Sequence, residues 1–161
     1  MAAKPTNTRR AAREMALRIL YTIDVGRQPV DEVFDETLAA HDLDEKSTQF
    51  CRTLVARTLD NRRAIDRTID RLAVGFPTLR QTPVDRNILR LAASEILFGS
   101  SDAPPGAVVN EAVELSKKYS TTESGKFVNG VLGTLVRETE ERTLAATIAA
   151  APVAEGESTD A

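Results

Sequence analysis

The chain has 161 residues, of which 42% are hydrophobic and 4% aromatic, with no tryptophan and a formal net charge of −3. This length allows one compact domain and excludes a catalytic domain beside a complete binding domain, and no apolar run approaches the ~20 residues of a membrane span. Because the core must be built mainly from Leu, Ile, Val and Ala, the composition favours packed helices over a β-sandwich, and we expect an all-α fold.

The first predicted element is a helix from Thr8 to Val25 that follows a flexible basic arm at residues 1–7. One side of this helix repeats apolar residues at helical spacing and should face the core. Residues 1–28 contain six Lys or Arg and two carboxylates, so this end has a surplus of four positive charges, which favours a polyanionic partner. A second sector of the helix carries arginines first and an apolar, aromatic pair later, namely Arg9, Arg10, Arg13, Leu17 and Tyr21.

The next predicted element is a short helix that begins near Pro29 and ends near His41. His41 is the only histidine in the chain. Since no second His or Cys lies nearby, we interpret it as a surface residue at a helix end and not as a metal ligand or catalytic base.

A longer helical segment follows from Asp44 to Leu72, with a break or bend expected at residues 60–63, where polar residues interrupt the apolar pattern. Its only cysteine, which is also the only one in the chain, is Cys51. Cys51 should pack as a small apolar residue, and its isolation indicates a reducing, cytoplasmic compartment. The arginines of this segment alternate with aspartates, which indicates an ion-paired solvent face; they are Arg57, Arg62, Arg63, Arg67 and Arg71, with Asp60, Asp66 and Asp70.

The sequence TPVD at Thr82 to Asp85 resembles a capping box and predicts a helix from Pro83 to about Phe98. Arg86 and Arg90 should form a basic pair on one side of this helix. Glu95 falls within the apolar stripe, so its carboxylate must be hydrogen-bonded or charge-paired, and we interpret it as a structural residue before a catalytic one.

Two more helices are expected. One spans about residues 106–119, and a second capping signal, Ser120 with Glu123, starts the last long segment. Asn129-Gly130 would usually suggest a hairpin, but the flanking apolar residues repeat every three to four positions, so a helix is preferred. Residues 144–161 form an Ala-rich, acidic tail that extends the helix at most partly and should end disordered.

The motifs of common enzymes are absent: the sequence has no glycine-rich phosphate loop, no Cys or His cluster and no nucleophile motif. We therefore expect no catalysis, no metal and no cofactor. Separated basic groups remain, at the start of the first helix, at Arg86 and Arg90, and at Lys126. Lys126 precedes Phe127, and an exposed aromatic ring beside a cation suits unpaired RNA, because a base can stack while the cation binds phosphate.

The chain resembles the NusB family of bacterial transcription antitermination factors over roughly residues 9–142. The resemblance is carried by RRAARE and ALRILY near the start, PVDRNILRLAASEIL in the middle, and VVNEAVELSKKYSTTESGKFVNGVLG, which is the most specific. It implies a single domain at residues 8–143 with about seven helices in two packed subdomains. It also implies a binding factor, without enzymatic activity, for single-stranded boxA-type RNA of ribosomal RNA transcripts. The implied protein partner is a small-subunit ribosomal protein that acts as NusE, with indirect links to transcribing RNA polymerase.

The resemblance also assigns roles to individual residues. Tyr21 and Asp85 match positions that meet the ribosomal protein. Glu123 matches an acidic position near RNA, where a carboxylate restrains binding, so its removal should strengthen binding. Ala11 stands where an arginine often continues the basic run. The positions that match or adjoin RNA contacts are Arg9, Arg10, Arg13, Arg86, Arg90, Lys126 and Phe127.

Our main hypothesis is therefore an RNA-binding antitermination factor that acts as a heterodimer with the ribosomal protein. One alternative is an accessory RNA-binding domain of a ribosomal RNA methyltransferase system, whose N-terminal region has a similar fold. Another is a helical protein-interaction module without RNA contact. A homodimer that covers the arginines would be a plausible storage form.

Overall fold

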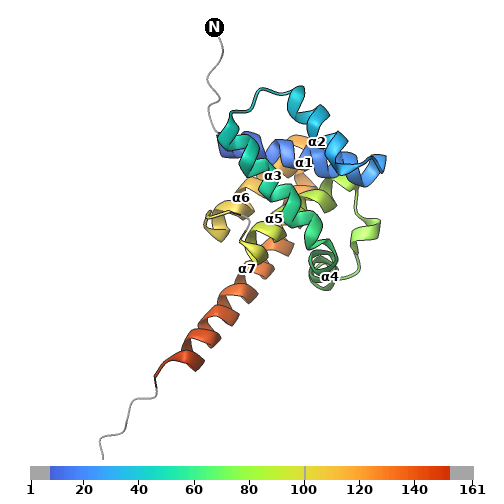
Figure 1. Ribbon diagram of the computed structural model, residues 1–161. Helices are drawn as coiled ribbons and strands as arrows, with labels where there is room; N and C mark the ends of the chain where they lie inside the picture. The colour runs from blue at the N-terminus through green and yellow to red at the C-terminus, as the bar shows by residue number, and fades with distance from the viewer. Residues whose placement is uncertain (1–7, 100, 153–161) are drawn as a thin grey trace, which may run out of the picture.

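The computed structural model of the protein describes residues 8–99 and 101–152, so the predicted basic arm and the end of the predicted tail lie outside the described residues. Across these ranges the chain forms α-helices and one 3₁₀ turn at Thr78–Arg80, without a β-strand, which confirms the all-α prediction (Figure 1). The seven helices are α1 (Thr8–Gly26), α2 (Val30–Ala39), α3 (Glu45–Asp60), α4 (Arg62–Leu72), α5 (Pro83–Phe98), α6 (Pro105–Tyr119) and α7 (Thr122–Ala150).

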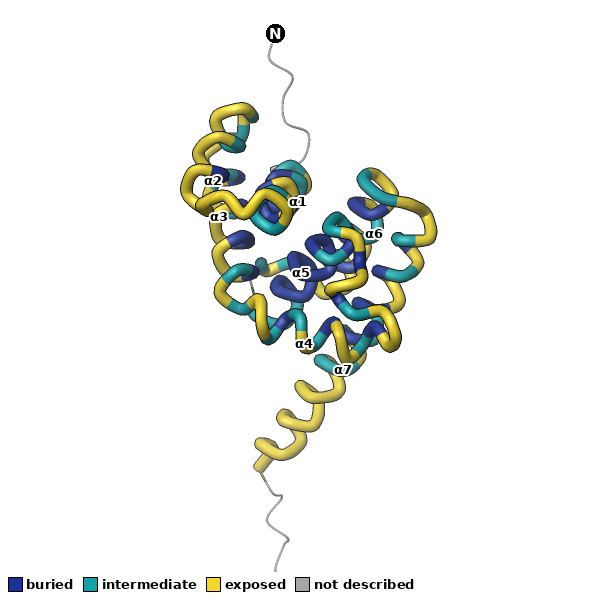
Figure 2. Tube along the Cα trace, turned by 90° about the vertical axis from the view of Figure 1, so that its right-hand side faces the viewer, coloured by how far each residue is buried: buried dark blue, intermediate teal, exposed yellow. Residues whose placement is uncertain are grey.

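Helix α5 lies at the centre of the fold, where it contacts α1, α3, α4, α6 and α7. Figure 2 shows it as a mostly buried segment enclosed by the other helices. A helix enclosed in this way can bury polar side chains only if they find partners. The buried polar side chains of α5 are Asp85, Asn87, Arg90, Ser94 and Glu95, and their partners determine what the rest of the molecule can present to solvent.

Side-chain caps fix several helix starts where the sequence predicted them. The Asp44 carboxylate accepts a hydrogen bond from the backbone N–H of Ser47 at 2.7 Å, and the Thr82 hydroxyl accepts one from that of Asp85 at 3.3 Å. Residue 61 separates α3 from α4, which confirms the predicted break. The last start differs by one residue, because Thr121, and not Ser120, caps α7 through the N–H of Ser124 at 3.0 Å.

The buried apolar side chains form one contiguous cluster to which all seven helices contribute. The cluster includes residues of α1–α3 and of α4–α7, so these two groups of helices share one core. Cys51 is fully buried within the cluster, and this burial raises the pKa of its thiol to about 12. A thiol in that setting is an inert packing group, as the sequence indicated.

Helix α7 continues well beyond the body of the protein. It includes Asn129 and Gly130, which confirms the preference for helix over hairpin at that pair, and it extends through most of the Ala-rich segment to Ala150. Its final turns project away from the other helices (Figure 1), and Leu144 and Ile148 on them are 62% and 67% exposed. No helix in residues 8–99 and 101–152 is long and apolar enough to cross a membrane.

Candidate nucleic-acid interface

The first two arginines of α1 are held at the surface by contacts with other elements. The Arg9 guanidinium lies 4.4 Å from the centre of the Phe50 ring and 3.3 Å from the Asp102 carboxylate, with 44% of its side chain exposed. Phe50, on α3, is partly buried, and its ring lies against the Arg9 guanidinium. Stacking on an aromatic face limits the motion of a guanidinium and leaves its N–H groups free to bind phosphate.

Arg10 is oriented by a two-pronged ion pair with Glu111 on α6. Its Nε and Nη2 donate to the two carboxylate oxygens at 3.1 and 2.9 Å, and 52% of the Arg10 side chain stays exposed. This hydrogen bonding lowers the pKa of Glu111 and raises that of Arg10. The pair therefore stays ionised at neutral pH, with about half of the Arg10 side chain exposed.

Arg13 does not lie on this surface, and the predicted solvent-facing sector is wrong at this residue. Its side chain is 7% exposed and its Nη2 donates to Glu95 at 2.8 Å, with Nε donating to the same carboxylate at 3.1 and 3.2 Å. The Glu95 side chain, 2% exposed, thus has the charge partner that the sequence analysis required. The physical reason is that a buried carboxylate needs a cation, and Arg13, one turn beyond Arg9, is within reach of it.

Arg86 and Arg90 were predicted to form a basic pair on one side of α5, but both are engaged in ion pairs with carboxylates of other helices. Arg90, 6% exposed, donates to both oxygens of Asp66 at 2.7 and 2.9 Å and to Asp24 at 3.3 Å. Arg86 donates to Asp24 at 2.6 and 3.0 Å, and Asn87 donates to the same carboxylate at 2.9 Å. This cluster joins α1, α4 and α5, so it fixes the positions of helices and leaves little of either guanidinium for RNA.

The cluster depends on the ionisation of Asp24. Burial alone would raise the pKa of Asp24, but hydrogen bonds from Arg86 and Asn87 and the charge of Arg90 lower it below its ordinary 3.8. A carboxyl group whose pKa is lower in the folded chain adds stability above its unfolded pKa and loses it as the pH falls through its folded pKa.

We therefore expect Asp24→Asn to lower the free energy of unfolding by about 2 kcal/mol at pH 7, because charged hydrogen bonds are lost. The difference from the unsubstituted protein should shrink as the pH falls below 3.8. Urea unfolding between neutral and acidic pH measures both effects, with Asp35→Asn on the exposed side of α2 as the control. A difference that stays constant down to acidic pH would contradict the role given to Asp24.

Lys126, Phe127 and Glu123 lie in the first turns of α7. The Lys126 side chain is 72% exposed and its Nζ lies 3.3 Å from the Glu123 carboxylate, which is 82% exposed. The Phe127 ring is partly buried and meets Phe76 edge-to-face with ring centres 5.4 Å apart. Phe76 follows α4 and is 41% exposed, so two aromatic rings stand where the sequence predicted one. The sequence signal that could have identified Phe76 was its position between Gly75 and Pro77, where an aromatic residue falls in a loop.

The starts of α1 and α7 both contact α6. Arg10 binds Glu111, while Gly125 packs against Val113 and Lys117, so the two contact points lie within about two turns of α6. Arg9, Arg10 and Lys126 are thus exposed on two helices that both pack on α6, whereas Arg13, Arg86 and Arg90 form ion pairs with other helices of the body.

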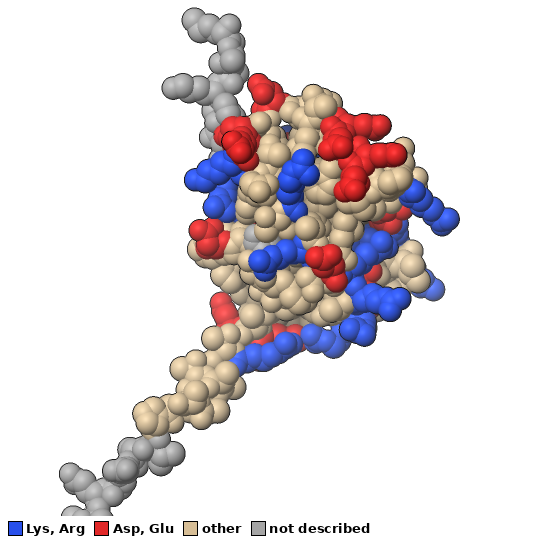
Figure 3. Space-filling view, viewed as in Figure 1, with Lys and Arg blue, Asp and Glu red and all other residues tan. Residues whose placement is uncertain are grey.

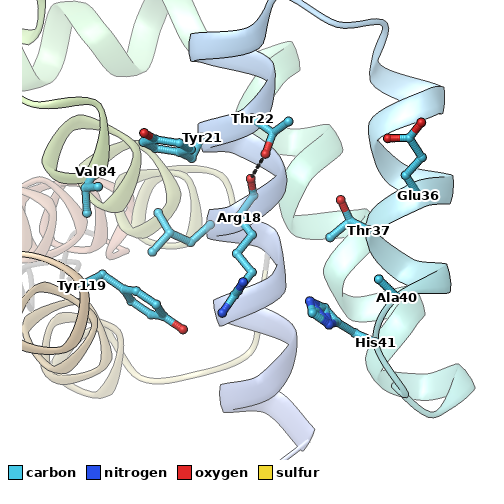
Figure 4. A pocket seen from close by; sticks show the side chains of 10 residues that line it. Arg18, Tyr21, Thr22, Glu36, Thr37, Ala40, His41, Val84 and Tyr119 are labelled. Atoms are coloured by element: carbon cyan, nitrogen blue, oxygen red, sulfur yellow. Dashed lines mark hydrogen bonds between the residues drawn. The ribbon is translucent and has the colours of Figure 1, made fainter.

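Tyr21 and Asp85, the predicted partner contacts, have different environments. Tyr21 is 40% exposed and lines a groove along α1, to which α2 contributes on one side and Val84 and Tyr119 contribute on the other (Figure 4). Asp85 is buried, which corrects its expected exposure, and it accepts a hydrogen bond from the Ser124 hydroxyl at 2.9 Å. Asp85 therefore ties the first turn of α7 to α5.

His41 lies just after α2 and is partly exposed in this groove. Within the described ranges no group of three or more His, Cys, Asp or Glu side chains is arranged to hold a metal ion.

The chain is similar to known proteins in sequence and in fold. Residues 10–137 match the model of the NusB family. The transcription antitermination protein NusB of Pelotomaculum thermopropionicum is 45% identical over 134 residues, which are 83% of this chain and 92% of the relative. A chain in the crystal structure of the antitermination factors NusB and NusE with double-stranded RNA has a TM-score of 0.75 at 30% identity, covering 83% of this chain and 98% of that one. A crystal structure of T. maritima NusB has a TM-score of 0.74 at 33% identity, covering 83% and 96%.

Proposed function

Because the chain belongs to the NusB family, we propose that it is a transcription antitermination factor that binds boxA-type RNA of ribosomal RNA transcripts together with a small-subunit ribosomal protein acting as NusE. It acts in the cytoplasm by binding and carries out no reaction itself. The observation that carries this proposal is the likeness to a chain captured in a complex of NusB and NusE with RNA.

Residues at the starts of α1 and α7 supply the proposed RNA contacts. Arg9 and Arg10 keep about half of their side chains exposed while Phe50 and Glu111 fix their orientation. Such pre-ordered guanidinium groups bind phosphate with less loss of side-chain entropy than free ones. Lys126 adds a third cation, and the rings of Phe127 and Phe76 offer faces and edges on which unpaired bases can stack.

The three inward-facing arginines have a different proposed role. Arg13 holds α1 on α5 through Glu95, while Arg86 and Arg90 hold α1 and α4 on α5 through Asp24 and Asp66. They position the helices that carry the RNA contacts, and they do not themselves bind phosphate.

The ribosomal protein is proposed to contact α1 at Tyr21 and the groove beside it. The groove has an apolar wall, to which Leu17, Tyr21 and Val84 contribute, and a polar wall on α2. A tyrosine at the rim can bury its ring against a partner while its hydroxyl forms a hydrogen bond, which is typical of protein interfaces. Asp85 supports this contact indirectly, because it fixes the adjoining turn of α7.

A binding titration tests the proposal. The full chain is titrated with a boxA-type single strand, a scrambled single strand and a duplex, each with and without the ribosomal protein. We expect the boxA-type strand to bind most tightly, the ribosomal protein to increase the affinity, and added salt to weaken it steeply. If the chain binds the ribosomal protein but binds none of the RNAs, the result would favour a protein-interaction module. RNA binding that the ribosomal protein leaves unchanged would favour an accessory domain of a modifying enzyme.

Glu123→Gln is expected to raise the affinity for boxA-type RNA roughly two- to fivefold, because it frees Lys126 from an exposed ion pair and removes a negative charge near phosphate. The measurement is the RNA titration in the presence of the ribosomal protein. Glu141→Gln on the projecting part of the same helix removes the same charge and serves as the control. Equal gains for both variants, or a loss of affinity for Glu123→Gln, would count against a local effect.

A further inference from the structure

Helix α4 carries arginines whose neighbouring aspartates are used elsewhere. Asp66 accepts two hydrogen bonds from buried Arg90 and lies 3.8 Å from Arg62. Asp70 accepts a hydrogen bond from the backbone N–H of Thr78 at 2.7 Å. Arg63 and Arg67 are exposed and have no ion pair with any residue in the described part of the chain. The predicted ion-paired face is therefore wrong at these two residues, because the fold draws the aspartates to other groups.

Three of these arginines line one hollow in the surface where α3 meets α4. Its walls contain a single carboxylate, Asp60, against three guanidinium groups, so the net formal charge of the lining is +2. Figure 3 shows Lys and Arg side chains gathered on the side of the molecule where Figure 1 places α4, while acidic side chains gather over α2. The residues that line the hollow are Leu59, Asp60, Asn61, Arg62, Arg63, Ala64 and Arg67.

The hollow is connected to the candidate RNA interface through α4 itself. Helix α4 ends at Leu72, and Phe76 in the following loop meets Phe127. Arg63, Arg67 and Arg71 recur every four residues, so they stand on one side of α4 about 6 Å apart along its axis. Arg71 is held by both oxygens of Glu138 at 2.9 and 2.8 Å, yet half of its side chain is exposed. A strand that leaves the two rings along α4 would meet a guanidinium group at each turn.

We propose that this hollow binds backbone phosphates of RNA that continues beyond the boxA-type element. The proposal rests on the proposed function, because the strand must first be held at the starts of α1 and α7. The planar guanidinium group presents paired N–H donors that match phosphate oxygens. Clustered arginines therefore suit an RNA strand, which carries a negative charge on every nucleotide. An acidic protein segment fits less well, because its carboxylates are not spaced so regularly.

The test compares one short RNA with two long RNAs on the full chain, with the ribosomal protein present. The short RNA contains only the boxA-type element, and the long RNAs extend it by unpaired nucleotides on one side or the other. The test variant is Arg63→Gln with Arg67→Gln. The control variant, Arg27→Gln with Arg52→Gln, removes the same charge from exposed arginines outside α4. Circular dichroism checks that both variants remain folded.

We expect one of the long RNAs to bind the unsubstituted protein more tightly than the short RNA. The test variant should lose this gain, with a log–log salt slope smaller by about 1.4 on the long RNA, and should bind the short RNA within about twofold of the unsubstituted protein. Asp60→Asn should strengthen binding of the long RNA only.

Equal affinities of the unsubstituted protein for long and short RNAs would overturn the proposal for the hollow and leave the proposed function intact. An equal loss for test and control variants would also overturn it, since the effect would then come from net charge. Loss of ribosomal-protein binding in the test variant, with RNA binding intact, would assign the hollow to a protein. Failure of the short RNA to bind the unsubstituted protein would instead overturn the proposed function.

Discussion

Replacing Arg13 with alanine is expected to lower the free energy of unfolding by about 3–5 kcal/mol, because it leaves the Glu95 carboxylate buried without a cation. Glu95 is 2% exposed and receives its charge partner from a different helix. Urea unfolding at pH 7, followed by far-ultraviolet circular dichroism, measures the change. If the variant is too unstable to purify, Arg13→Lys, which keeps a charge but loses the paired geometry, gives a smaller loss of the same sign.

Two controls separate this effect from a general loss of charge. Arg9→Ala removes an exposed arginine from the same helix and should cost less than about 1 kcal/mol. Arg13→Met combined with Glu95→Leu removes both buried charges and should recover most of the stability. If Arg13→Ala unfolds like the unsubstituted protein and instead lowers the salt dependence of RNA binding, Arg13 contacts phosphate and its assignment as a positioning residue is wrong.

The second large effect concerns RNA. Arg9→Gln combined with Arg10→Gln is expected to weaken binding of boxA-type RNA roughly 10- to 100-fold at low salt, because two phosphate contacts are lost. The slope of log affinity against log salt should fall by about 1.4. The variant also leaves Glu111 without the guanidinium that lowers its pKa, so a free carboxylate adds repulsion next to the strand. Fluorescence anisotropy over a range of salt concentrations measures both the affinity for RNA and the slope of log affinity against log salt.

The loss should be specific to the start of α1. Arg27→Gln combined with Arg52→Gln changes the net charge equally and should leave the affinity for the short boxA-type strand nearly unchanged. Adding Glu111→Gln to the double variant should restore part of the affinity by removing the repulsion. A slope that is the same for the double variant and for the unsubstituted protein would show that Arg9 and Arg10 do not neutralise phosphate.

The helices could be predicted from the sequence because their signals are local. Thr82, Pro83 and Asp44 mark helix starts through hydrogen bonds or backbone angles within one turn, and the start of α7 at Thr121 was missed by one residue because several hydroxyl residues there can cap. The apolar spacing also identified the core, including Cys51. The same spacing correctly predicted that Asn129 and Gly130 are helical.

The orientation of the arginines could not be predicted in this way, because it is decided by carboxylates far away in the sequence. Glu95 lies 82 residues from Arg13, and Asp24 lies 66 residues from Arg90. A helical projection places Arg9, Arg10 and Arg13 in one sector, and only the packing of α1 on α5 shows that the third is buried. The second ring, Phe76, was missed for the same reason, since its partner Phe127 comes from a distant helix.

The projecting end of α7 carries the chain away from the candidate RNA interface. Phe127 lies near the start of this helix and Ala150 is its last residue, so the chain leaves the helix roughly 35 Å from the ring along the axis. At physiological ionic strength the screening length is about 8 Å, so charges that far apart scarcely interact. Within the described residues the helix therefore acts as a spacer, and its last residue, Ala150, lies several screening lengths from the ring.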